Sequence, residues 1–393
     1  MLDKSILVIN TGSSSLKFGL YAEQNGRETV QFDGLAEGIG QNNGTLQVKD
    51  AEGRTVRSEN LSFASRHDAL THAAAWLREL SSAEPVAVGH RVVHGGPRLT
   101  QHQRITPELI ADLRSCVHFA PLHIPMALQL IEEAERAYPN VPQFACFDTA
   151  FHCTMPDIAK RFPLSKTLFE DGIRRYGFHG LSYESIVYQL GDTLGRRTVI
   201  AHLGSGASLV AIKDGQSMDT SMGLTPTGGI PMATRTGDLD PGVLLYLNRA
   251  KKMNADSLEK LLNHDAGLKA LSGGTADMRE LQNAAKAGNG DAELAIDAFC
   301  LAIGKTVAAY AVVLGGLDML VFAGGIGEHS SLVRSQVCER LAFLGLAFDT
   351  RENEANAAKI SAANSSASIC VVASQEDLQI ARHCRKMMRN NNQ

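Results

Sequence analysis

The chain has 393 residues, of which 44% are hydrophobic and 20% are charged, and its formal net charge is −4. This length exceeds one ordinary core and favours two domains, each with a normal interior. Neither a basic stripe nor an acidic tail is present, which argues against nucleic acid or an anionic membrane surface as the main partner. An anionic substrate would have to be bound by a few placed arginines.

The sequence also predicts the cellular compartment. Seven cysteines without a C-x-x-C pair fit a reducing compartment, without disulfides or zinc. The first apolar run is too short and too β-branched for a signal peptide. Residues 307–327 are apolar enough to suggest a membrane span, but Asp318 and two Gly-Gly pairs interrupt them, which predicts a buried helix followed by a buried strand. We therefore expect a cytoplasmic protein that is not bound to a membrane.

The chain opens with a strand-rich pattern. Residues 5–9 and 16–21 predict two strands joined by a Gly/Ser turn. Asn25-Gly26 predicts a hairpin turn that leads to a third strand near Val30.

A similar pattern returns roughly 190 residues later. Residues 198–201 and 209–212 predict strands joined by a small-residue turn, and Asp214-Gly215 predicts the next hairpin. Two such units suggest duplicated domains that share one fold, with chance similarity as the alternative.

The rest of the chain mixes helices with buried strands. Helical spacing covers residues 63–80, 106–138, 292–317 and 376–388, and strands are expected at residues 86–93, 142–147, 319–322 and 371–373. No low-complexity linker divides the halves, which predicts two domains packed around a cleft.

Two loops have the composition of phosphate-binding turns. Residues 10–17 (NTGSSSLK) and 202–208 (HLGSGAS) combine hydroxyls and N–H donors with glycines that let the backbone approach an anion. The first is not a Walker A loop, which opens a helix. Each loop alone is compatible with an ordinary polar turn. Together, at matching positions of a duplicated fold, they could hold a polyphosphate from both sides.

A third loop and two arginines add to this pattern. Residues 323–329 (AGGIGEH) follow a buried strand, and their small side chains leave room for a flat ring such as adenine. A tight strand-to-helix turn is the alternative. Arg91 and Arg235 stand among glycines and small residues, where a guanidinium suits carboxylates and phosphates. A structural ion pair is the alternative for each arginine.

Three further positions carry candidate reactive groups. Asp148 ends a strand, His179 lies between glycines, and Glu376 precedes Asp377 at the start of the terminal helix. A lone histidine is more often an ordinary core or surface residue, and acids at a helix start can simply complement the helix dipole. Both ordinary roles stay open.

Taken together, these motifs resemble the acetate kinase family of the actin, heat-shock-70 and sugar-kinase superfamily. The matching segments follow in order over nearly the whole chain: residues 10–17, 89–96, 147–152, 176–180, 202–208, 219–223, 233–235 and 324–328. The resemblance implies an α/β protein with two duplicated domains of the ribonuclease H-like/actin-type ATPase fold around a central cleft. The expected domains are 1–150, onto which the C-terminal helix 376–393 packs back, and 151–375, which binds the nucleotide.

The resemblance also implies roles for single residues. The expected catalytic residues are Asp148, His179 and Arg235. Mg²⁺ (or Mn²⁺) is expected on Asn10 and Glu376. Arg91 is expected to bind the substrate's carboxylate or phosphate, and a small apolar pocket for its methyl group is expected from Val93, Leu122, Phe178 and Pro226. ATP is expected on Lys17, His202, Leu203, Gly204, Ser205, Gly206, Asp277, Met278, Arg279, Gly325, Ile326, Gly327, Glu328 and His329.

The chain departs from the family pattern at several positions. Ile124, Ser205, His329 and Gln375 each replace an asparagine that is usual in the family, and residues 227–229 read TGG where L-E-G is usual. These changes bear on nucleotide preference and substrate size. The charged and metal-binding residues are intact, so the implied reaction class is unaffected.

The reaction that the resemblance implies is direct in-line transfer of the γ-phosphoryl group of ATP to acetate, reversibly giving acetyl phosphate and ADP, in a homodimer. A carboxylate nucleophile is already deprotonated, so Asp148 is expected to orient Mg²⁺ or the nucleophile more than to take a proton. Three alternatives stay open: a propionate or other short-chain acid kinase, a sugar kinase, and a non-enzymatic actin-like ATPase. The apolar pocket argues against a sugar, and an actin-like protein would leave Arg91 and Arg235 without a role.

Overall fold

A computed structural model of the chain describes residues 4–11, 15–41, 43–81, 84–121 and 123–390. The chain packs as two compact units: unit 1 is Met1–Ala150 with Gln375–Gln393, and unit 2 is Phe151–Ser374. The predicted domains 1–150 with 376–393 and 151–375 stay a proposal, because a packing unit is not by itself a domain that folds or binds alone.

Unit 1 is built on one mixed β-sheet with the strand order β5-β4-β3-β2-β1-β6-β8-β7. Its strands are β1 (Ile6–Thr11), β2 (Ser15–Gln24), β3 (Arg27–Glu37), β4 (Gly44–Asp50), β5 (Thr55–Leu61), β6 (Ala87–Val92), β7 (Gln103–Arg104) and β8 (Gln143–Phe147). β1 runs antiparallel to β2 and parallel to β6, and β6 is parallel to β8. Asn25 and Gly26 have φ of 52° and 78°, which suits the predicted two-residue hairpin.

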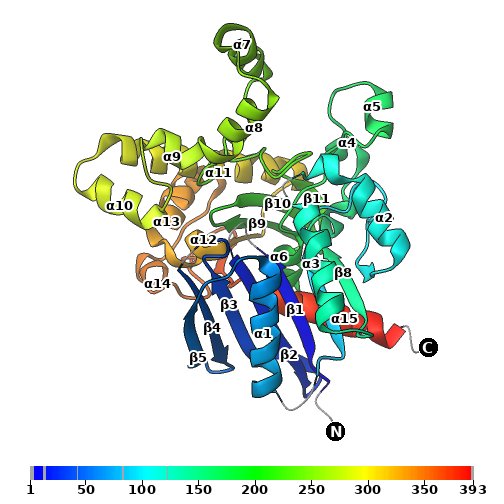
Figure 1. Cartoon of the computed structure of the whole chain (residues 1–393). Helices are drawn as coiled ribbons and strands as arrows, with labels where there is room; N and C mark the ends of the chain where they lie inside the picture. Colours follow the sequence, from blue (N-terminus) through cyan, green and yellow to red (C-terminus); the bar gives the residue numbers. More distant parts are fainter. Residues whose placement is uncertain (1–3, 12–14, 42, 82–83, 122, 391–393) are drawn as a thin grey trace. The chain divides into compact units, whose positions relative to one another are not determined.

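Helices cover both faces of this sheet (Figure 1). They are α1 (Arg66–Leu80), α2 (Pro107–Ser115), α3 (Ile124–Ala137) and α15 (Glu376–Asn390). α1 and α3 share a hydrophobic core with Leu7 and Val88. Because strand residues alternate between faces, Gly89 faces the other side, where a Cβ atom would lie 2.6 Å from Ile380 and 2.7 Å from Cys384 of α15. The glycine therefore lets the terminal helix pack directly on β6.

Unit 2 repeats this plan in a smaller sheet. Its strands are β9 (Arg197–Leu203), β10 (Ala207–Lys213), β11 (Gln216–Thr220), β12 (Met319–Ala323) and β13 (Ser368–Val371), in the order β11-β10-β9-β12-β13. β9 runs antiparallel to β10 and parallel to β12, which is parallel to β13. This is the order and direction of β3-β2-β1-β6-β8 in unit 1. The predicted α/β fold with duplicated units is confirmed.

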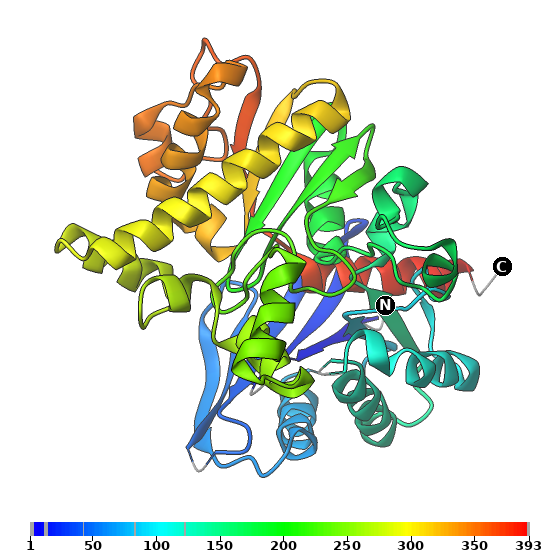
Figure 2. The same cartoon turned by 90° about the horizontal axis from the view of Figure 1, so that it is seen from above.

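The helices of unit 2 include one long apolar helix, α11. They are α4 (Asp157–Lys160), α5 (Lys166–Glu170), α6 (Gly180–Leu190), α7 (Pro241–Lys251), α8 (Ala255–His264), α9 (Gly267–Leu271), α10 (Met278–Lys286), α11 (Gly290–Leu314), α12 (Gly324–His329), α13 (Ser331–Arg340) and α14 (Thr350–Glu354). By length and composition alone, α11 could cross a membrane. It packs against β9 and β10 (Figure 2), and Phe299, Ile303 and Val307 on it are completely buried, as in the core helix of a globular unit.

One helical prediction is only partly right. Residues 106–138 form two helices, because α2 ends at Ser115, a 3-10 turn follows at Val117–Phe119, and α3 begins at Ile124. Pro121 lies within this break, and Pro125 is the second residue of α3. Proline lacks the N–H that a helix interior needs but is well accepted in the first helical turn.

Candidate active site

In unit 1, an arginine and two carboxylates form an ion-pair cluster. Arg91 lies in β6, Asp148 directly follows β8, and Glu376 is the first residue of α15. Arg91 donates from Nε and Nη2 to Asp148 Oδ2 at 3.0 and 2.8 Å, and its Nη1 lies 2.9 Å from Glu376 Oε2. The two side chains from β6 and β8 meet because these are neighbouring parallel strands with their carboxyl ends at one edge.

The cluster keeps Arg91 charged and leaves some N–H groups of its guanidinium for a ligand. Burial alone would lower the pKa of its guanidinium, but Asp148 and Glu376 outweigh burial and raise that pKa well above its usual value. A guanidinium has five N–H donors, and the cluster uses the Nε–H and one N–H on each terminal nitrogen. The remaining terminal N–H groups can bind an oxyanion, as the resemblance implies.

Asp377 is a member of this site that the sequence analysis missed. Its Oδ1 accepts a hydrogen bond from Asn10 Nδ2 at 3.2 Å, and its Oδ2 lies 2.8 Å from Lys17 Nζ. Burial lowers the pKa of Lys17, but the charge of Asp377 overcomes this and raises it. The acidic pair at the start of α15 was the available signal, but only Glu376 was given a site role.

The oxygen atoms of unit 1 fit a hard divalent cation. Asn10 donates through its amide nitrogen, so its Oδ1 lies at the opposite end of the amide and can act as a ligand. Three carboxylates surround two cations, Arg91 and Lys17, so the cluster carries one net negative charge. Mg²⁺ prefers oxygen ligands and a small number of carboxylates. Asn10 and Glu376, with Asp148 as a further donor, therefore form a chemically suitable set.

In unit 2, His179 and Arg235 approach the same glycine. A Cβ atom on Gly206 would lie 3.3 Å from His179 Nε2 and 3.6 Å from Arg235 Nη1. His179 precedes α6 with a left-handed backbone, φ 59° and ψ 22°, which non-glycine residues seldom adopt. Backbone strain of this kind concentrates at functional sites. His179 and Arg235, two of the three expected catalytic residues, thus lie beside one another.

Arg235 carries a half-buried positive charge with neutral neighbours. Its Nη1 donates to Pro226 O at 3.2 Å and lies 3.9 Å from Met232 Sδ. Among the described residues, no carboxylate lies within ion-pair distance of this guanidinium, and burial lowers its pKa. A buried cation without a counter-charge is unfavourable. An anionic ligand would relieve this cost.

His152 supports the loop that carries His179. Its Nε2 donates to Phe178 O at 3.0 Å, and its Nδ1 lies 3.0 Å from Ser217 Oγ. Burial lowers its pKa to about 4, so His152 is neutral near pH 7. A Cβ atom on Gly177 would lie 2.6 Å from the His152 ring. The glycine thus allows the loop to pack on His152, which has a structural role.

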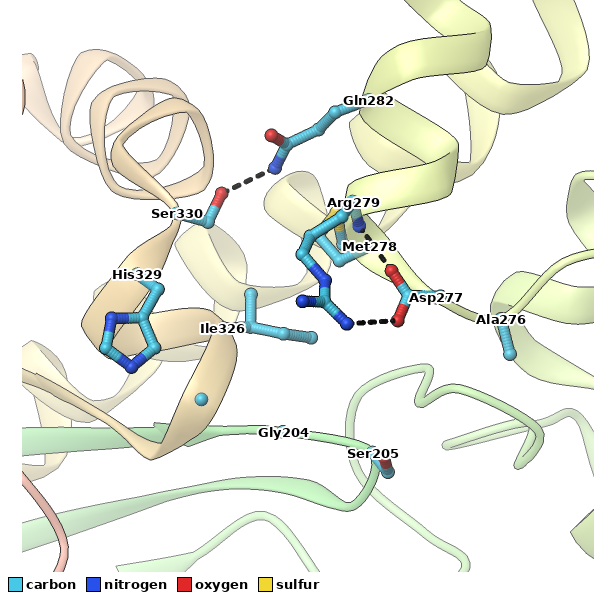
Figure 3. A pocket seen from close by; sticks show the side chains of 11 residues that line it. Gly204, Ser205, Ala276, Asp277, Met278, Arg279, Gln282, Ile326, His329 and Ser330 are labelled. Carbon is cyan, nitrogen blue, oxygen red and sulfur yellow. Dashed lines mark hydrogen bonds and ion pairs between the residues drawn. The ribbon is translucent and has the colours of Figure 1, made fainter. Parts of the chain in front are cut away.

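Unit 2 also holds a pocket of about 390 Å³ (Figure 3). It is lined by Gly204, Ser205, Ala276, Asp277, Met278, Arg279, Gln282, Gly325, Ile326, His329 and Ser330. Eight of these are residues that the sequence analysis assigned to the nucleotide. Ala276, Gln282 and Ser330 were missed, and a 2.7 Å hydrogen bond joins Gln282 to Ser330. Gln282 lies one turn after Met278 on α10, which was the signal that could have found it.

The other nucleotide residues predicted in unit 2 are not part of this lining. His202 stacks on His179, with ring centroids 4.4 Å apart. Leu203 is completely buried in β9. Gly327 and Glu328 lie in α12, where Glu328 Oε1 accepts a hydrogen bond from the Ser374 amide at 3.2 Å. Their roles, and that of Lys17 in unit 1, stay predictions.

The predicted methyl pocket is not gathered within either unit. Half-buried Val93 follows β6 in unit 1, while buried Phe178 and half-buried Pro226 belong to unit 2. Leu122 lies outside the described residues. Ile124, one of the departures from the family pattern, is 1% exposed at the start of α3. The pocket therefore stays a prediction.

Comparisons with known proteins agree with one another. The sequence pattern of the acetokinase family matches residues 5–382. The chain is 42% identical to an acetate kinase of Methylocella silvestris over 397 residues, which cover 97% of each chain. It is similar in structure to the acetate kinase of Porphyromonas gingivalis (TM-score 0.89, 36% identity, 98% of this chain and 100% of that one). It is also similar to a propionate kinase from Francisella tularensis (TM-score 0.91, 36% identity, 96% of this chain and 98% of that one).

Proposed function

Because the chain belongs to the acetokinase family, we propose that it reversibly transfers the γ-phosphoryl group of ATP to acetate, giving acetyl phosphate and ADP. The observation that carries the proposal is similarity to an acetate kinase over 97% of both chains, together with intact charged clusters in each unit. Propionate is the second candidate acceptor, because one of the similar structures is a propionate kinase.

The residues of unit 1 would prepare the nucleophile. Acetate is ionised at neutral pH, so no general base is needed. One acetate oxygen attacks the γ-phosphorus in line, and a new O–P bond forms as the bond from that phosphorus to the leaving oxygen of ADP breaks. The N–H groups of Arg91 that are left over would bind the carboxylate. Asp148 accepts hydrogen bonds from two nitrogens of Arg91, Nε and Nη2, and we assign it to holding that guanidinium and the metal.

The residues of unit 2 would stabilise the phosphoryl group during transfer. Negative charge is spread over its equatorial oxygens in the transition state. Arg235 supplies a guanidinium that pairs with no carboxylate of the part of the chain that the structure describes, and His179 presents Nε2 beside it. Donors of this kind act most strongly where water is excluded. The nucleotide base would occupy the pocket between α10 and α12.

Mg²⁺ is part of the proposal, held by Asn10 and Glu376 with Asp148. When bound it would neutralise charge on the phosphate oxygens and orient them. Asp377 would hold Asn10 and Lys17 in place through the contacts described above.

The test is a hydroxylamine trap for acyl phosphate. The protein with Mg-ATP and acetate should give acetohydroxamate, and propionate should give less product. Chelation of the metal should stop the reaction, and Mg²⁺ or Mn²⁺ should restore it. Phosphorylation of glucose or glycerol with no hydroxamate from any acid would overturn the proposal in favour of a sugar kinase.

We also expect a homodimer in the cytoplasm. α7 and α8 contain no buried residue and project from the rest of unit 2 (Figure 1). Leu245 and Tyr246 on α7 are 53% and 58% exposed, and an exposed apolar face of this kind suits an interface. All seven cysteines are free thiols, which fits a reducing compartment. Sedimentation velocity would measure the oligomeric state.

A further inference from the structure

A buried hydrogen-bonded chain lies behind His179 in unit 2. His179 Nδ1 is 2.8 Å from Ser208 Oγ, and Ser208 Oγ in turn makes a short hydrogen bond with the hydroxyl of Tyr183. Ser208 and Tyr183 are completely buried. The chain therefore connects the imidazole to the interior of unit 2, on the side away from Gly206.

The ring of His179 is also held in its plane. The ring of His202 stacks on it at 4.4 Å with an interplanar angle of 25°, and His202 Nδ1 is itself 2.8 Å from Ser182 Oγ. With one face stacked and Nδ1 bonded to Ser208, the ring presents Nε2 toward Gly206 and Arg235. The orientation of Nε2 thus depends on His202 and Ser208.

The order of donors in this chain decides which nitrogen carries the proton. A phenol is more acidic than an aliphatic hydroxyl and is the better donor, which favours Tyr183 O–H donating to Ser208 Oγ. Ser208 then directs its own hydrogen to His179 Nδ1, and each hydrogen bond strengthens the next. In a neutral imidazole, an Nδ1 that accepts leaves the proton on Nε2. Nε2–H is then a donor.

We propose that Ser208 and Tyr183 are positioning residues that fix the Nε2–H tautomer of His179. The inference rests on the proposed phosphoryl transfer. The opposite tautomer would point a lone pair at the phosphoryl oxygens and repel them, whereas Nε2–H donates to them beside Arg235. Neither Ser208 nor Tyr183 needs to touch the substrate for this effect.

Kinetics of single variants provide the first test. Ser208→Ala should lower kcat by about tenfold, as loss of an outer hydrogen-bond partner commonly does, while KM for ATP and acetate stays nearly unchanged. Tyr183→Phe keeps the ring and should lower kcat in the same direction by a smaller factor. Ser208→Thr retains the hydroxyl and should be more active than Ser208→Ala. Ser185→Ala is the matched control, because it removes a buried hydroxyl of α6 that donates to Ser182 O within the same helix.

Nitrogen NMR of the full-length protein provides a readout that a merely structural role would not move. With ¹⁵N-labelled histidine, and His179→Asn to assign the signal, wild-type His179 should show a protonated Nε2 and a bare Nδ1. Ser208→Ala and Tyr183→Phe should shift the signal toward a mixture of tautomers, and Ser185→Ala should not. The proposal is overturned if Ser208→Ala or Tyr183→Phe lowers kcat while the tautomer of His179 is unchanged. It is also overturned if these variants change neither kcat nor the tautomer.

The two proposals fail in different ways. An inactive wild-type protein on every acid tested would overturn acyl phosphate formation, while the NMR result would still report the tautomer. If Ser208→Ala does not fold, Tyr183→Phe carries both measurements, and an unchanged tautomer in that variant counts against the proposal.

Discussion

Two buried or half-buried arginines in unit 1 and two in unit 2 have partners of opposite kinds. In unit 1, Arg91 is paired with Asp148 and Glu376, and Arg385 is paired with Glu28. In unit 2, Arg235 meets a backbone carbonyl and a thioether, and completely buried Arg334 donates to Asn353 and to backbone carbonyls. Arg91 and Arg385 in unit 1 are thus neutralised by carboxylates, whereas Arg235 and Arg334 in unit 2 rely on neutral acceptors.

This difference suggests a division of labour between the units. The excess of carboxylate in unit 1 suits a divalent cation, and its arginine is fixed by strong pairs before any substrate arrives. The positive charge of Arg235 is available for an anion and gains most from one that carries extra negative charge in the transition state. Mutations in the two units should therefore fail differently.

The largest effect on stability should come from Arg91→Ala. It leaves Asp148, 1% exposed, without its strongest partner, and breaking a buried ion pair in this way destabilises by about 3 kcal/mol. KM for acetate should also rise more than kcat falls, because the guanidinium serves mainly binding. Urea unfolding and steady-state kinetics measure the two effects. Unchanged stability would mean that the pair does not hold the free protein together.

Arg235→Ala should show the opposite pattern. Losing a donor that acts on transition-state charge lowers kcat by about 10²- to 10³-fold. Removal of a half-buried charge that has no counter-ion among the described residues should nevertheless not lower the unfolding midpoint. Arg235→Lys, which keeps the charge without the planar fork, should recover part of kcat. Near-wild-type kcat in Arg235→Ala would contradict the assigned role.

Both units should share one sensitivity to acid. Burial lowers the pKa of His90 in unit 1 and His152 in unit 2 to about 4, compared with about 6.5 in an unfolded chain. As pH falls from 6.5 toward 4, the histidines of the unfolded chain bind protons before those of the folded protein. The contribution of the two histidines to the free energy of unfolding is therefore fully present above pH 6.5 and decreases below it. Each histidine should account for about 2 kcal/mol of the loss between pH 7 and pH 5. Urea midpoints at both pH values measure this.

Variants separate the two contributions. His152→Gln and His90→Gln should each reduce the difference in unfolding free energy between pH 7 and pH 5 by the contribution of one histidine. This holds even if the substitution also changes stability at pH 7. A wild-type protein equally stable at pH 5 and pH 7 would mean that these rings are not buried in neutral form.

Local sequence was sufficient for the α/β fold and for most strands, but not for side-chain pairing. It also placed the last strand at residues 371–373, whereas β13 is Ser368–Val371, and it did not predict β4 and β5. Hairpins at Asn25-Gly26 and Asp214-Gly215 follow from turn chemistry within two residues, and both form as predicted. Asp377 could not be ranked, because its partners Asn10 and Lys17 lie more than 350 positions away in the sequence. The left-handed backbone of His179 was equally invisible, since it depends on how its loop packs.

The smallest expected effect concerns the acyl group. If half-buried Val93 ends the methyl pocket, Val93→Ala makes room for one more carbon. A methylene in an apolar pocket contributes about 1–3 kcal/mol to binding, and we expect the lower value here. The ratio of kcat/KM for propionate over acetate should therefore rise about fivefold to tenfold. Competing acids in the hydroxamate assay measure this ratio, and Val92→Ala, in the buried strand beside it, is the control for loss of packing. A ratio that is the same in wild type and Val93→Ala would remove Val93 from the pocket while leaving phosphoryl transfer untouched.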